Sequence, residues 1–90
     1  MLGANLEKVK IMDKVYVVIK HTNLIDSDEV EIVCVNKSKH FAYLHMLMEA
    51  EQFYEEYTVL EDSECYMRFT DIDKCVLIEL IIEEKEVIDW

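Results

Sequence analysis

The sequence predicts an α+β domain in which an antiparallel sheet of four to five strands, in the order β-β-α-β-β, packs against one long helix. One uninterrupted helical segment covers residues 38–57, strand-like runs flank it on both sides, and turn-forming residues separate those runs. The chain has 90 residues, 52% of them hydrophobic, with no proline and the single glycine Gly3. These numbers predict one compact domain over residues 1–90 with a modest core and no linker.

The helix is predicted from residues 38–57 because no glycine, proline or β-branched residue interrupts them. Asn36 or Ser38 can accept a hydrogen bond from a free amide of the first turn. With 3.6 residues per turn, the segment has a wider and a thinner apolar side. The wider side, which we expect to face the sheet, consists of Phe41, Leu44, Leu47, Met48 and Tyr54, flanked by Tyr43, Ala50 and Tyr57.

The thinner apolar side contains Ala42, Met46 and Phe53. A helix that is apolar on two sides either lies between two layers or keeps one side for a partner. We therefore expect this side to be covered within the chain or to contact a partner, with Met46 and Phe53 as apolar anchors.

The strands are predicted from runs rich in β-branched and aromatic residues. Before the helix, an Asn, Asp and Ser turn joins two such runs into a hairpin. After the helix, a short optional strand precedes two more runs joined by a tight turn at residues 71–74. The predicted strands are residues 14–21, 29–35, 58–61 (optional), 65–70 and 75–83.

The two ends of the chain carry weaker signals. Residues 2–13 suit a short helix or an irregular arm, and residues 84–90 either extend the last strand or form a tail. In the last strand, alternation places Leu77 and Ile81 on the same face as Glu79. An open edge on this strand would favour self-pairing.

The formal net charge of −11 is unevenly distributed. Residues 1–48 contain six acidic residues and six lysines, whereas residues 49–90 contain fourteen acidic residues and three basic ones. This balance argues against direct binding to nucleic acid or to anionic membranes, because both depend on Lys and Arg. A basic protein is the natural partner.

The sequence predicts a cytoplasmic protein that does not span a membrane. The first residues lack a basic segment followed by an apolar one, and no apolar run approaches the roughly 20 residues that a membrane span needs. Cys34, Cys65 and Cys75 have no CxxC spacing, and we expect them to be small core residues in a reducing compartment.

No motif predicts an enzyme, a metal site or a cofactor. His40 and His45 point about 140° apart on a helix and cannot share a metal ion unaided. The acidic turns at residues 26–29 and 71–73 lack the glycine-centred loop of a calcium site. No nucleophile has a visible base and orienting group.

The function predicted from these observations is that of a small acidic inhibitor or regulator that binds a protein. Its carboxylates would imitate DNA phosphates and block a basic, nucleic-acid-handling partner. In size and acidity the chain is similar to phage-encoded inhibitors of host defence, including anti-CRISPR proteins and DNA mimics. The expected acidic surface consists of Glu49, Glu55, Glu56, Glu61, Asp62, Glu64, Asp71, Asp73, Glu83, Glu84 and Glu86.

A second hypothesis belongs to a different class. The chain would be a homo-oligomeric structural or regulatory subunit, assembling as a dimer or larger oligomer through a sheet edge or the back of the helix.

Overall fold

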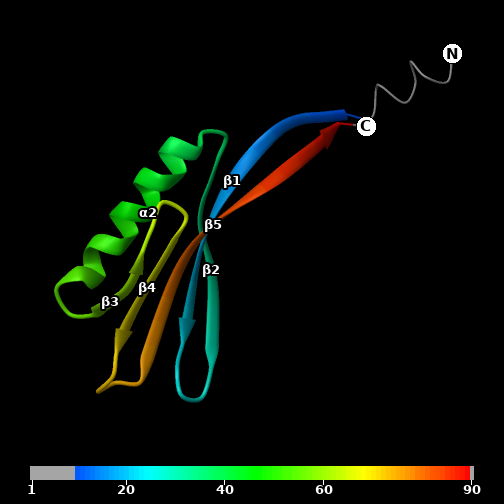
Figure 1. The fold of residues 1–90 in the computed structure, drawn as a ribbon. Coiled ribbons are helices and arrows are strands. Elements are labelled where there is room, and N and C mark those ends of the chain that lie inside the picture. Colours follow the sequence, from blue (N-terminus) through cyan, green and yellow to red (C-terminus); the bar gives the residue numbers. More distant parts are fainter. Residues whose placement is uncertain (1–9, 90) are drawn as a thin grey trace, which may run out of the picture.

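The structure is a computed structural model that describes the backbone of residues 10–89 and the side chains of residues 14–87. It is an α+β fold in which one helix accompanies a five-stranded antiparallel sheet in the spatial order β2-β1-β5-β4-β3 (Figure 1). The short strand expected as optional is present, so the chain order is β-β-α-β-β-β. The elements are β1 (Lys10–Asn23), β2 (Asp28–Asn36), α2 (Lys39–Tyr54), β3 (Thr58–Asp62), β4 (Tyr66–Asp71) and β5 (Val76–Asp89).

The last strand lies in the middle of the sheet. β5 pairs antiparallel with β1 on one side and with β4 on the other. The expectation of an open edge bearing Leu77 and Ile81 is therefore wrong. A central place satisfies the backbone groups of the most apolar strand on both sides, which an edge place would leave unpaired.

β1 and β5 extend beyond the rest of the sheet as a two-stranded ribbon. β2 pairs with β1 only from Tyr16 onward, and β4 pairs with β5 only as far as Ile81. The remaining parts of both strands pair with each other and project from the body (Figure 1). We call residues 10–15 and 84–89 the ribbon arm.

The ribbon arm shows that the structure predicted for the N-terminal end is wrong. It also shows which of the two alternatives for the C-terminal end is present. Residues 10–13 belong to β1 and not to a helix or an irregular segment. Residues 84–89 continue β5. The rest of both predicted ends, residues 2–9 and Trp90, lies outside the described residues.

The helix begins as the sequence predicts. The Ser38 hydroxyl accepts a hydrogen bond from the Phe41 amide at 3.3 Å, and the Asn36 side chain accepts one from the Ser38 amide at 2.9 Å. Both predicted capping residues therefore satisfy backbone donors at the start of α2.

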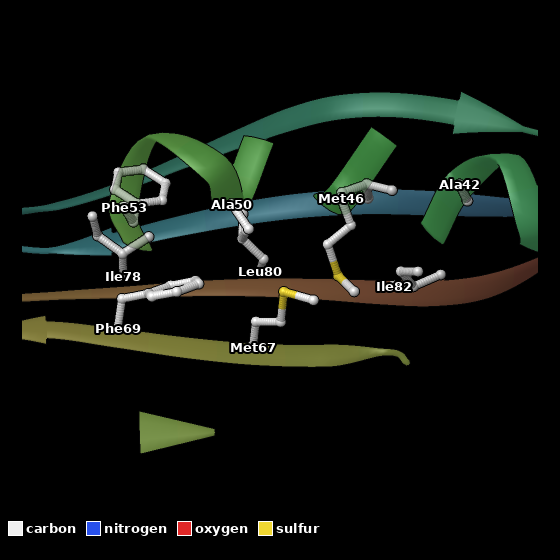
Figure 2. Close-up of a cluster of buried hydrophobic side chains, with 10 residues drawn as sticks. Ala42, Met46, Ala50, Phe53, Met67, Phe69, Ile78, Leu80 and Ile82 are labelled. Atoms are coloured by element: carbon white, nitrogen blue, oxygen red, sulfur yellow. The ribbon is translucent and has the colours of Figure 1, made fainter. Parts of the chain in front are cut away.

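The prediction of which helix side faces the sheet is wrong. The buried residues are the three of the thinner side, Ala42, Met46 and Phe53, together with Ala50, which was expected to flank the wider side, and all four point at the sheet in Figure 2. On the wider side, Phe41 is exposed at 55%, Leu44 at 38%, Met48 at 67% and Tyr54 at 39%, whereas Tyr43, Leu47 and Tyr57 are half-buried against the core. Two alanines let the helix backbone approach the strands closely, which a line of large side chains would prevent. Met46 and Phe53 are core residues and not surface anchors.

The sheet contributes the other half of the core through alternate positions of three strands. Its buried residues are Val18, Met67, Phe69, Ile78, Leu80 and Ile82. Leu77, Glu79 and Ile81 alternate with them and point to the opposite side of the sheet, as the pattern predicts. We call this side, which α2 does not cover, the open face.

Two of the three cysteines are not core residues. Cys65 and Cys75 are exposed and Cys34 is half-buried. Cys75 lies in the β4–β5 turn with φ of 55°, and its amide donates to the Ile72 carbonyl at 3.2 Å. Turn geometry, and not burial, accounts for its position.

Candidate protein-binding surfaces

The structure does not bring the eleven predicted carboxylates into one surface. They fall on the middle of α2 (Glu49), the end of α2 and β3 with its following loop (Glu55, Glu56, Glu61, Asp62, Glu64), the β4–β5 turn (Asp71, Asp73) and the distal part of β5 (Glu83, Glu84, Glu86). A strand rises about 3.3 Å per residue, so Val76 and Glu86 lie about 33 Å apart. The turn and the ribbon arm are therefore separate sites.

Two carboxylates on distal β5, Glu83 and Glu84, have lysine partners. Lys14 Nζ lies 3.6 Å from Glu84 Oε2, and Lys85 Nζ lies 3.0 Å from Glu83 Oε2. At the β4–β5 turn, Lys74 Nζ lies 3.9 Å from Asp71 Oδ2. These lysines offset part of the negative charge in both places.

A run of exposed acidic residues lies along the β3 edge of the sheet, where Glu61 is paired in register with Arg68 of β4. Residues 49–67 contain seven carboxylates and no Lys or Arg. Five of them follow one another from the end of α2, along β3 and into the next loop, and all five are exposed. We call Glu55, Glu56, Glu61, Asp62 and Glu64 the β3-edge surface.

One contact ties this surface to the helix. The Tyr54 hydroxyl donates to Asp62 Oδ2 at 3.2 Å, and the Tyr54 ring packs edge-on against Phe69. Burial, followed by the charge of Asp62, raises the pKa of the Tyr54 hydroxyl. Within the described part of the chain, the other four carboxylates of the surface form no ion pair.

Glu49 has a structural role instead. Lys20 of β1 donates to Glu49 Oε1 at 2.8 Å and lies 3.1 Å from Glu31 Oε2 of β2. The hydrogen bond to Glu49 is the largest cause that raises the pKa of the Lys20 amine. Lys20 thereby joins the helix to two strands. No local sequence pattern predicts this contact, because Lys20 and Glu49 are 29 residues apart in the chain.

We expect Glu49→Gln to lower the free energy of unfolding by about 1–2 kcal/mol, since both partners are mostly shielded from water. Because the pKa of Lys20 is raised above 10.5, this contribution is present below that pH and is lost as pH rises through the raised value. Urea unfolding at pH 7 measures the loss. Glu84→Gln at the exposed pair with Lys14 is the matched control, and an equal loss there would contradict the assignment.

A polar row crosses the open face. His21, Glu79 and Arg68 lie side by side on β1, β5 and β4. His21 Nδ1 is 3.3 Å from Glu79 Oε1, Arg68 Nε is 3.9 Å from Glu79 Oε2, and the Tyr66 hydroxyl donates to Glu79. That hydrogen bond raises the pKa of Tyr66. The row contains no nucleophile and joins three strands. The one feature of the sequence that indicates this polar row is Glu79, a charged residue between apolar neighbours.

Two lines of large apolar side chains face solvent. On the outer side of α2 they are Phe41, Leu44 and Met48. On β2 they are Val30, Ile32 and Val35, exposed at 70%, 64% and 58%. Sequence patterning missed the second line, because it continues the alternation of an ordinary half-buried strand.

An open pocket of about 320 Å³ lies at the N-terminal end of α2 and is lined by Lys39, His40, Tyr43 and Glu64. His40 and His45 are exposed. Among residues whose placement is described, no three His, Cys, Asp or Glu side chains are grouped to hold a metal ion. Within the same part of the chain, no helix has the length and apolar character needed to cross a membrane.

Comparison of the chain with known protein families, curated proteins and solved structures finds no match.

Proposed function

We propose that this chain is a non-enzymatic inhibitor or regulator that binds a basic, nucleic-acid-handling protein through the β3-edge surface. The observation that carries the proposal is that the five exposed carboxylates of the β3-edge surface lie in a stretch, residues 55–67, that contains no Lys or Arg. Lysines contact Glu83, Glu84 and Asp71, whereas among the described residues four of the five carboxylates of the β3-edge surface form no ion pair and can contact a basic partner.

The geometry of the edge supports imitation of a nucleic-acid backbone. β3 has five residues, so it spans roughly 16 Å, and exposed carboxylates lie before it, at its end and just after it. Lys and Arg side chains that bind phosphates can also bind carboxylates at such spacings, because both groups are negatively charged. The acidic side chains and the short length of β3 oppose its pairing with another strand, which favours its accessibility to a partner.

Charge reversal tests the location of binding. The variant Glu55→Lys, Glu56→Lys, Glu61→Lys is compared with Glu83→Lys, Glu84→Lys, Glu86→Lys, which changes the net charge equally on distal β5. The wild type and each variant are immobilised separately. Each is used to capture proteins from a cell extract rich in nucleic-acid-processing enzymes, at low and at high salt. We expect the wild type and the β5 variant to retain the same basic partner and the β3-edge variant to lose at least about tenfold in affinity, since several charge contacts are reversed.

Competition with duplex DNA tests the mimicry itself. A partner whose DNA-binding surface is occupied by the carboxylates should be released by added duplex DNA as well as by salt. Equal losses in both charge-reversal variants would point to net charge alone. Retention of the partner in the presence of excess DNA would contradict the proposal.

A further inference from the structure

The two edges of the sheet differ in ways that matter for association. β3 is short, which opposes strand pairing, whereas both edge strands contain acidic residues and a bulge, which in β2 lies between Ile32 and Cys34. β2 has nine residues and pairs with β1 on one side only among the described strands. Its side chains on the open face include the exposed Val30 and Ile32.

The hydrogen-bonding direction of β2 follows from its hairpin. The Leu24 amide donates to the Ser27 carbonyl at 2.8 Å, which closes the loop and defines these residues as a bonded pair. In an antiparallel ladder, bonded and non-bonded pairs alternate, and the register is regular from this loop to Ile19 and Ile32. The backbone groups of Val30 and Ile32 therefore point away from β1, toward the free edge. The exposed apolar residues are also the ones with free donors and acceptors.

The charges at the two ends of β2 are opposite. Asp26 and Asp28 lie at its start, and Lys37 and Lys39 follow its end. An antiparallel partner with the same sequence would place each acidic end beside a basic end. The midpoint of Asp28–Asn36 is Ile32, so pairing about this residue also keeps Glu29 and Glu31 away from their own counterparts.

We propose that β2 pairs antiparallel with β2 of a second copy of this chain, centred on Ile32, to form a continuous ten-stranded sheet. Ile32 meets its own counterpart at the two-fold axis and exchanges backbone hydrogen bonds with it. Val30 and Val35 of both copies extend the apolar part of the open face across the junction. The β3-edge surfaces remain free at the two far ends of the dimer.

Substitution at the two-fold axis has a doubled effect. Ile32→Lys places two like charges directly opposite each other, so we expect the dimer to weaken by at least about 100-fold. Sedimentation equilibrium over a wide range of protein concentrations measures the change. Ile72→Lys, in the β4–β5 turn at 79% exposure, is the matched control and should leave the dimer intact. A wild-type monomer at all concentrations, or an Ile32→Lys protein that remains dimeric, would overturn the proposal.

Disulfide cross-linking gives a second readout that does not depend on the fold of the lysine variant. In a background with all three native cysteines replaced by serine, Ile32→Cys should form a covalent dimer on mild oxidation. The Cα atoms of a bonded antiparallel pair lie about 5.5 Å apart, which suits a disulfide. Ile72→Cys is the control, and equal cross-linking of both variants would also contradict pairing at Ile32.

The outcome is separable from that of the proposed function. A monomeric Ile32→Lys protein keeps the β3-edge surface, so it should still bind a basic partner at a single site. Loss of the dimer and loss of partner binding therefore test two different edges of the sheet.

Discussion

Replacing Met46 with alanine should lower the free energy of unfolding by about 2–5 kcal/mol, because the side chain is fully buried between α2 and the sheet. The loss combines the transfer of apolar atoms to water with the cavity that remains. Small domains are stable by about 5–15 kcal/mol, so the variant should show a large fall in its urea midpoint.

Met48→Ala is the control, because it removes the same atoms two residues further along the helix. Met48 is 67% exposed, and its replacement should change the free energy of unfolding by no more than about 0.5 kcal/mol. Similar losses for the two variants would contradict burial of the thinner helix side. Met46→Leu, which nearly conserves volume, should recover most of the stability.

Leu80→Ala should have a comparable effect, about 2–5 kcal/mol, and tests the sheet half of the same core. Leu80 is fully buried on central β5, where it faces α2 alongside Met67 of β4 (Figure 2). Equilibrium unfolding in urea, followed by circular dichroism, measures the loss.

Leu77→Ala makes the identical chemical change on the other side of β5. Leu77 lies half-buried on the open face, and we expect a loss of at most about 1 kcal/mol, since fewer of its contacts disappear. A loss at Leu77 as large as that at Leu80 would show that a further layer covers the open face.

The strand and turn assignments could be made from sequence because they rest on local chemistry. Asn and Asp side chains mark the loop between β1 and β2, and the Ser38 cap marks the start of α2. The helix itself follows from an uninterrupted run of residues with good helix propensity.

The side of the helix that packs could not be predicted in the same way. Periodicity measures how much apolar surface a side offers, but packing depends on how closely two backbones can approach. Ala42 and Ala50 let α2 lie close to the strands, and this advantage outweighs the larger area of Phe41 and Met48. This changes the candidate site directly, because Met46 and Phe53 were expected on the surface but lie in the core.

The acidic surface was predicted in part. Composition located most of the negative charge in the second half of the chain, but it could not show which carboxylates have cationic partners. Lys14 comes from β1 and meets Glu84 only because the two strands pair over their whole length. The β3-edge surface is distinguished from the other acidic residues by such ion pairs, which only the structure shows.

The amino-acid sequence alone determined the strands, the helix, the turns and the excess of negative charge, because each depends on residues close together in the chain. Only the tertiary structure decided the buried helix side, the central place of β5, the compensated carboxylates and the free edge of β2. These features depend on contacts between residues far apart in the chain. Several arrangements fit the local sequence patterns equally well, and the distance between backbones and the order of the strands determine which one forms.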